Sequence, residues 1–147
     1  MSGFAPVNYT ASATLSAYEA NTITTVNAAA GLTLTLPAAT GTGRRYDIVI
    51  GTTITSNSVI IKVASATDWL AGAIWASTDN ASDGTVSFET ATGALASRSD
   101  TITLNGTTTG GLAGDRFTLH DIGTGQWEVT GWMTATGTEV TPFSAAV

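Results

Sequence analysis

The stretch LTLTLP, residues 32–37, decides the fold class of this chain. Leu32, Leu34 and Leu36 alternate with two threonines until Pro37 ends the run. Strict alternation of apolar and polar residues is typical of a β-strand with one buried face, and proline cannot continue a hydrogen-bonded strand. The stretch therefore predicts a half-buried strand.

Further short apolar runs continue toward the C-terminus, at residues 46–50, 59–63, 85–88, 101–104, 116–122 and 126–133. The first two flank a turn-forming stretch and predict a buried hairpin. The last two are joined by Gly123-Thr124-Gly125 and predict another. Residues 66–75 instead predict one short helical turn, because Thr67 and Asp68 are suitable N-cap residues. About seven or eight short strands with regular turn signals predict an all-β fold, a small β-sandwich or β-barrel.

The composition agrees with this class and excludes several partners. Charged residues make up 11% of the 147 residues, against roughly 25% in an ordinary soluble domain. The formal net charge is −6, with five lysines and arginines. Nucleic acid and acidic membrane surfaces both require clustered cations, so the sequence predicts neither as a partner. No apolar run reaches the length of a membrane span, and no cysteine is present to form a disulfide.

Residues 1–20 differ from the rest of the chain. They are rich in Ala, Ser and Thr, and their aromatic residues Phe4, Tyr9 and Tyr18 follow no period that would bury one face. They also lack the basic and apolar regions of a secretory signal. We interpret residues 1–20 as an extended N-terminal arm and residues 21–147 as the β domain, and we expect the aromatic side chains to contact a neighbouring molecule.

No motif for catalysis or metal binding is complete. His120 is the one histidine, and strand alternation directs it away from the adjacent Asp121, whereas a catalytic triad needs the two in contact. Residues 79–84 partly match a calcium-binding loop, but Ala81 and Thr90 occupy two ligand positions. The glycine-rich residues 110–114 lack the lysine of a phosphate-binding loop. The sequence thus predicts no enzyme, no catalytic residue, no cofactor and no metal.

The chain has four tryptophans, at positions 69, 75, 127 and 132. Tryptophan is common both in cores and at the energetic centres of interfaces. Trp127 shares strand parity with Val129, whereas Gly131 leaves the face of Trp132 open. We expect two core and two interface tryptophans, and we assign Trp69 and Trp132, with Phe4, Tyr9 and Tyr18, to an interface with another molecule or with other subunits.

Three stretches carry a resemblance to a known family: LTLTLPAATGTGRRYDIVIGT (residues 32–52), SNSVIIKVASATDWLAGAIW (56–75) and DTITLNGTTTGGLAGDRFTLHDIGTGQWEVTGWMTATGTEVTPFSAA (100–146). The chain from about residue 28 to 147 resembles the decoration proteins of tailed bacteriophages, which include head-stabilising (cement) and head-fibre proteins. The resemblance implies a β-rich subunit on the capsid exterior that binds the major capsid protein, stabilises the head and commonly forms a homotrimer. It implies no catalytic residues.

Two other functions remain open at this stage. Similar Thr- and Gly-rich β modules occur in phage tail fibres, so the chain is alternatively a receptor- or carbohydrate-binding module whose exposed tryptophans stack on sugars. An enzyme such as a polysaccharide depolymerase is the third hypothesis. The preferred expectation is a virion structural protein, made in the host cytoplasm and located on the capsid exterior.

Overall fold

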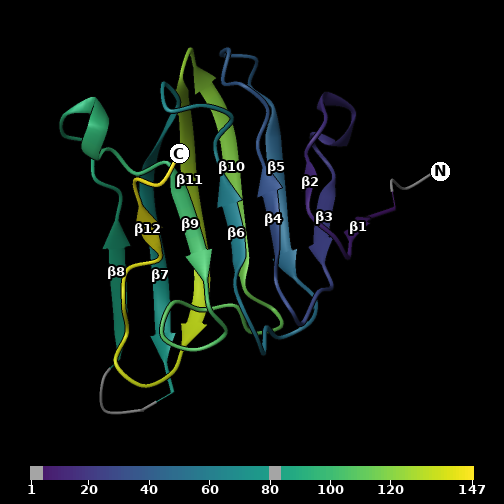
Figure 1. The fold of residues 1–147 in the computed structure, drawn as a ribbon, viewed down its shortest axis with the longest axis vertical. Coiled ribbons are helices and arrows are strands. Elements are labelled where there is room, and N and C mark those ends of the chain that lie inside the picture. The colour runs from purple at the N-terminus through teal and green to yellow at the C-terminus, as the bar shows by residue number, and fades with distance from the viewer. Residues whose placement is uncertain (1–4, 80–83) are drawn as a thin grey trace.

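Two mixed β-sheets packed face to face form the fold, which confirms the predicted all-β class and the sandwich architecture (Figure 1). The computed structural model describes residues 5–79 and 84–147. The larger sheet has seven strands, in the order β1 (Val7–Tyr9), β3 (Ile23–Val26), β5 (Arg45–Ile50), β10 (Arg116–Gly123), β11 (Gln126–Ala135), β7 (Trp69–Thr78) and β8 (Thr85–Glu89). The smaller sheet has five, in the order β12 (Phe143–Ser144), β9 (Thr101–Leu104), β6 (Val59–Lys62), β4 (Leu32–Thr35) and β2 (Ala13–Thr14). Two 3₁₀ turns, η1 (Ala17–Glu19) and η2 (Leu95–Ser97), complete the described elements.

The first six strands wind between the two sheets. β1, β3 and β5 lie in the larger sheet and pair in parallel, while β2, β4 and β6 pair in parallel in the smaller sheet. The chain alternates between the larger and the smaller sheet. The order β1, β3, β5 in one sheet therefore runs in the same direction as β2, β4, β6 in the other (Figure 1). Parallel neighbours require such crossover connections, because a tight turn joins only antiparallel strands.

This winding corrects the hairpin predicted for residues 46–50 and 59–63. Both runs are strands, but β5 belongs to the larger sheet and β6 to the smaller. The connection between them is not a turn, since Ile54 is buried within it and its amide donates to the carbonyl of Gly111 at 3.0 Å. The second predicted hairpin is confirmed, because β10 and β11 pair antiparallel around Gly123-Thr124-Gly125.

Alternation along the strands builds the core between the sheets. In the smaller sheet, Leu34 lies beside Ile61, and Ile61 lies beside Ile102, all with buried side chains. In the larger sheet, the buried rings of Tyr46 and Trp127 lie with centroids 5.8 Å apart. Burial of apolar area at roughly 25 cal/mol per Å² is the main stabilising contribution of such a core.

The helical turn predicted for residues 66–75 is wrong, because this region begins β7. Leu70 and Ile74 fit both helical and strand spacing, but all ten residues of β7 are paired with β11 as a strand. At Gly72 the backbone has φ +143°, and an added Cβ would lie 1.9 Å from the carbonyl oxygen of Val129. Gly72 therefore allows β7 to lie against β11, where a larger residue would clash with the neighbouring backbone.

The predicted arm, residues 1–20, is extended over much of its described part but is not separate from the sandwich. β1 pairs with β3, β2 pairs with β4, and the side chain of Leu15 is buried in the core. The amide of Leu15 also donates to the carbonyl of Thr35 at 2.8 Å. These contacts place β1 and β2 at one edge of the two sheets (Figure 1).

Candidate binding surfaces

One edge of the sandwich presents a single, very exposed tyrosine. The side chain of Tyr18 in η1 is 97% exposed. The chain runs from β2 through η1 into β3 at this edge (Figure 1). We call this edge, formed by β1, β2 and η1, the N-terminal corner. An aromatic side chain that contacts almost nothing in its own chain is available to contact another molecule.

Hydrogen bonds hold the backbone of η1 in place. The carboxylate of Glu19 accepts from the amide of Ser16 at 2.5 Å and from the hydroxyl of Tyr9. The carbonyl of Ser16 in turn accepts from the hydroxyl of the buried Tyr46 at 2.9 Å. Tyr18 is thus carried on a turn that is fixed on both sides to the sheets.

The ionisation of these groups follows from the same contacts. Burial opposes the charge on Glu19, but the hydrogen bonds from Ser16 and Tyr9 outweigh it, so the pKa of Glu19 is lowered. Burial and the neighbouring Glu19 carboxylate raise the pKa of Tyr9 to about 12. Around neutral pH the neutral phenol of Tyr9 on β1 therefore donates a hydrogen bond to the carboxylate of Glu19 on η1.

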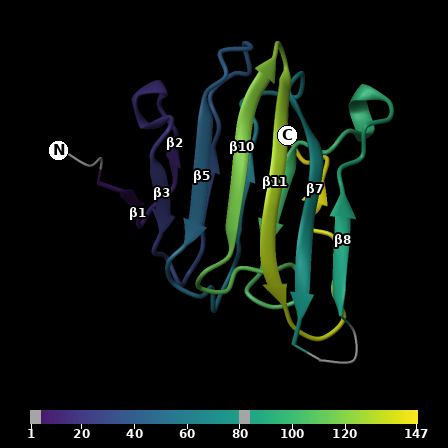
Figure 2. The same cartoon turned by 180° about the vertical axis from the view of Figure 1, so that it is seen from behind.

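The outer face of the larger sheet presents a second surface, shown facing the reader in Figure 2. Trp132 on β11 and Trp75 on β7 are directly paired in register, and their side chains are 48% and 45% exposed. The same register continues through Arg116 on β10 and Val49 on β5, and on the other side to Ser87 on β8. We call Val49, Arg116, Trp132, Trp75 and Ser87 the tryptophan row.

The residues assigned to an interface from sequence fall into different places. Tyr18 and Trp132 are exposed, on the two surfaces just described. Tyr9 is half-buried and packs against the core, and Trp69 is half-buried beneath the guanidinium of Arg98, which lies 4.5 Å from the ring centroid. Phe4 lies outside the described residues.

Sequence reasoning missed Trp75 and Arg116. The helical turn predicted for residues 66–75 hides the strand parity that Trp75 shares with Trp69. Arg116 was recognised only as one of five cations. The signal that would have found both is the register of β7, β11 and β10, which depends on long-range pairing.

His120 and Asp121 point to opposite faces of β10, as their strand positions predict. His120 lies on the outer face with Nδ1 3.4 Å from the carboxylate of Glu128. Asp121 is buried, and its carboxylate accepts from the amides of Thr40, Gly41 and Thr42 at 2.6–3.0 Å and from the Thr42 hydroxyl at 2.6 Å. Burial acts to raise the pKa of Asp121, but these hydrogen bonds together have the larger effect, so the pKa of Asp121 is lowered.

Within the partial calcium-loop match, residues 80–83 lie outside the described residues, and Asp79 accepts a hydrogen bond from the amide of Gly137 at 3.3 Å. Across the described ranges, 5–79 and 84–147, no group of three His, Asp or Glu side chains is placed to hold a metal ion. The same ranges contain no helix long and apolar enough to cross a membrane.

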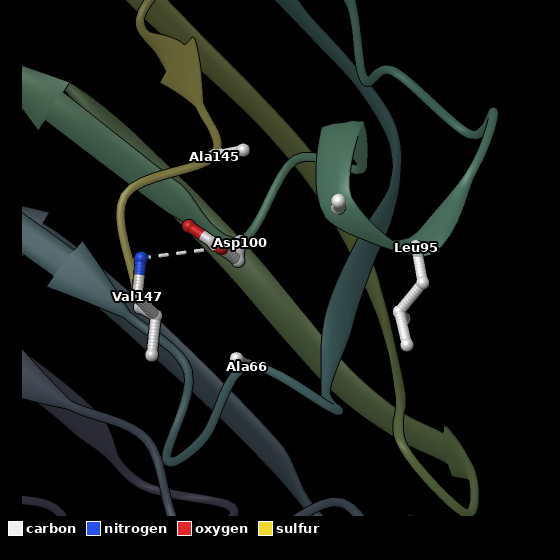
Figure 3. Close-up of a pocket in the computed structure, with 6 residues that line it drawn as sticks. Ala66, Leu95, Asp100, Ala145 and Val147 are labelled. Carbon is white, nitrogen blue, oxygen red and sulfur yellow. Dashed lines mark hydrogen bonds between the residues drawn. The ribbon is translucent and has the colours of Figure 1, made fainter.

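A small hollow of about 340 Å³ lies beside the C-terminal segment (Figure 3). It is lined by Ala66, Leu95, Ala96, Asp100, Ala145 and Val147. Its carboxylate is already engaged, because Asp100 accepts from the amides of Ala146 at 2.8 Å and Val147 at 3.3 Å and from the Thr101 hydroxyl at 2.7 Å. Asp100 therefore anchors the chain's own C-terminal segment beside the hollow.

Comparison with models of known protein families, with curated proteins and with solved structures finds no match to this chain.

Proposed function

We propose that this protein is a non-catalytic structural subunit of a tailed-bacteriophage virion, a decoration protein that binds the major capsid protein on the capsid exterior and stabilises the head. The sequence resemblance to decoration proteins is one support. The structural observation that carries the proposal is the N-terminal corner, where Tyr18 is held out from the sandwich on a hydrogen-bonded turn.

An exposed aromatic side chain on a fixed backbone turn suits a docking contact. Tyrosine is enriched among the few residues that dominate binding energy, because it buries a large area with only two rotatable bonds. Ordering a flexible loop on binding costs free energy, and the hydrogen bonds of Ser16, Glu19 and Tyr46 reduce that cost because they hold the turn before binding. A rigid η1 therefore favours binding through Tyr18.

The strand edges at the same corner allow a second kind of contact. Among the described residues, β1 and β2 each pair on one side only, so part of their backbone is available to a strand of a neighbouring subunit. Association through this edge is compatible with a homotrimer, the assembly that the resemblance implies.

Binding to particles that lack the protein tests the proposal. Purified protein is added to such particles and the bound amount is measured by sedimentation and gel densitometry. We expect saturable binding by the wild-type chain and at least about thirtyfold weaker binding by Tyr18→Ala, since truncation of a hot-spot residue costs about 2 kcal/mol or more.

Leu95→Ala is the matched control, because Leu95 is also exposed and apolar but belongs to η2. This variant should bind like the wild-type chain. Absence of saturable binding by the wild-type chain would contradict the decoration role, and equal binding by Tyr18→Ala would contradict the role of the N-terminal corner.

A further inference from the structure

The tryptophan row offers two exposed tryptophans at directly paired positions on a rigid support. Trp75 and Trp132 occupy directly paired positions on β7 and β11, whose backbones lie about 4.8 Å apart. These two strands share ten paired positions, with β10 and β8 on either side. The rings are therefore positioned by the sheet and do not depend on a loop.

Hydroxyl groups surround these rings. Thr130 and Thr134 lie on the outer face of β11 on either side of Trp132, Ser77 follows Trp75 along β7, and Ser87 is paired with Trp75. The hydroxyls of Ser77 and Thr134 are 3.2 Å apart. The centre of a protein interface is usually more apolar than this, whereas aromatic rings bordered by hydroxyls match the C–H faces and hydroxyls of a sugar.

One cation completes the row. Arg116 is paired with Trp132, is exposed, and forms no hydrogen bond or ion pair with another described residue. Its charge contributes to lowering the pKa of Asp47, although burial acts in the opposite direction and Arg45 and Thr118 supply the larger lowering contributions. Asp47 is bound directly by Arg45 and Thr118, which leaves the guanidinium of Arg116 free for a carboxylate of a ligand.

We infer that the tryptophan row is a binding site for a saccharide that carries a carboxylate, such as a uronic or sialic acid. Sugar rings stack on Trp75 and Trp132, and the carboxylate pairs with Arg116. The net charge of −6 disfavours a polyanion such as single-stranded nucleic acid, which also stacks on aromatic rings, but it tolerates a ligand with one or a few carboxylates. This site lies apart from the N-terminal corner, and the inference does not depend on the decoration role.

Nuclear magnetic resonance of the full chain tests the site. The indole N–H signals of the four tryptophans are followed during titration, up to millimolar concentration, with trigalacturonic acid and with 3′-sialyllactose. Methyl-esterified trigalacturonic acid and lactose serve as the neutral counterparts, and a short oligothymidylate as the polyanion. We expect at least one acidic sugar to shift the signals of Trp75 and Trp132 and to leave the buried Trp127 unchanged.

Variants separate the two parts of the site. Trp75→Ala and Trp132→Ala should each abolish binding, and Arg116→Gln should weaken the acidic sugar roughly tenfold, close to its neutral counterpart. Leu95→Ala, at an exposed apolar residue of η2, is the control and should bind like the wild-type chain. The inference is overturned if neither acidic sugar shifts these indoles, if the neutral sugars bind equally well and Arg116→Gln has no effect, or if the oligothymidylate binds more tightly than the sugars.

Discussion

At the scale of single residues, buried carboxylates connect distant parts of the chain. Asp68, Asp100, Asp115 and Asp121 are all buried, and each accepts at least one backbone amide hydrogen bond. Asp121, for example, ties residues 40–42 to β10. Several of the eleven acids are therefore structural, which the net charge of the sequence does not reveal.

The first prediction concerns Asp121→Asn. An asparagine keeps one acceptor but turns an amide donor toward backbone N–H groups, so we expect a loss of about 1–3 kcal/mol in the free energy of unfolding at pH 7. Because the pKa of Asp121 is lowered from its ordinary 3.8, its contribution is present above pH 3.8 and is lost as the pH falls through the folded-state value. Urea denaturation at pH 7 and pH 3 should show a smaller difference between variant and wild type at pH 3.

Glu89→Gln, at an exposed position on β8, is the control and should leave the free energy of unfolding at pH 7 nearly unchanged. A loss for Asp121→Asn that is the same at both pH values would argue against the charged hydrogen-bond acceptor as the cause.

The second prediction concerns Gly72→Ala. The added methyl group would overlap the carbonyl oxygen of Val129, so β7 and β11 must separate locally, and we expect a loss of about 2–4 kcal/mol. Gly93→Ala is the matched control, since its nearest neighbour would be 3.6 Å away. Chemical denaturation of both variants should show a shifted midpoint for position 72 alone.

At the scale of elements, local pattern predicts strands better than it predicts their partners. The alternation at residues 32–36 and the loop at 123–125 correctly predicted β4 and the β10–β11 hairpin. Pattern could not assign β5 and β6 to different sheets, because both are short apolar runs and the sheet that each joins depends on non-local pairing. At β7, apolar spacing satisfied a helix and a strand equally, and packing against β11 decided the outcome.

The candidate surfaces show the same limit. Tyr18 and Trp132 are exposed, as a contact with another molecule requires. Tyr9 is half-buried because it packs on the core and binds Glu19. Trp69 is half-buried because Arg98 covers its ring. The pairing of Trp75 with Trp132 joins residues from strands far apart in the sequence. Composition could indicate surface tryptophans but could not place them side by side.

The third prediction concerns Leu15→Ala. The sequence pattern predicts an extended arm at residues 1–20, but the structure buries Leu15 in the core. We now expect Leu15→Ala to lower the free energy of unfolding by about 2–5 kcal/mol, as for other buried leucines. Circular dichroism during urea denaturation measures this loss. A loss below about 0.5 kcal/mol would instead support an independent arm.

At the scale of the whole molecule, few charges are available for binding a partner. Arg45 is paired with Asp47, and Arg98 covers Trp69. Exposed ion pairs contribute roughly 0–1 kcal/mol each, so apolar contacts of residues such as Tyr18 should dominate the affinity for a capsid.

The same low charge and the open strand edges favour self-association, and light scattering at micromolar protein should give the mass of a trimer.

The fourth prediction concerns salt. Raising the ionic strength from about 0.1 M to 1 M shortens the Debye length from roughly 10 Å to 3 Å, which should leave apolar docking largely intact. Decorated particles are washed at both salt concentrations, and the retained protein is measured by gel densitometry. We expect retention to change little. Complete release at high salt would show that the exposed acids of the chain meet a basic capsid surface.

The location of the protein on phage particles is the most direct test of the decoration role. Particles are labelled with an antibody against the protein and imaged by negative-stain electron microscopy. We expect label over the whole capsid exterior, and no label on particles from a phage in which the gene for this chain is deleted. Label confined to the tail, or no label on intact particles, would contradict it.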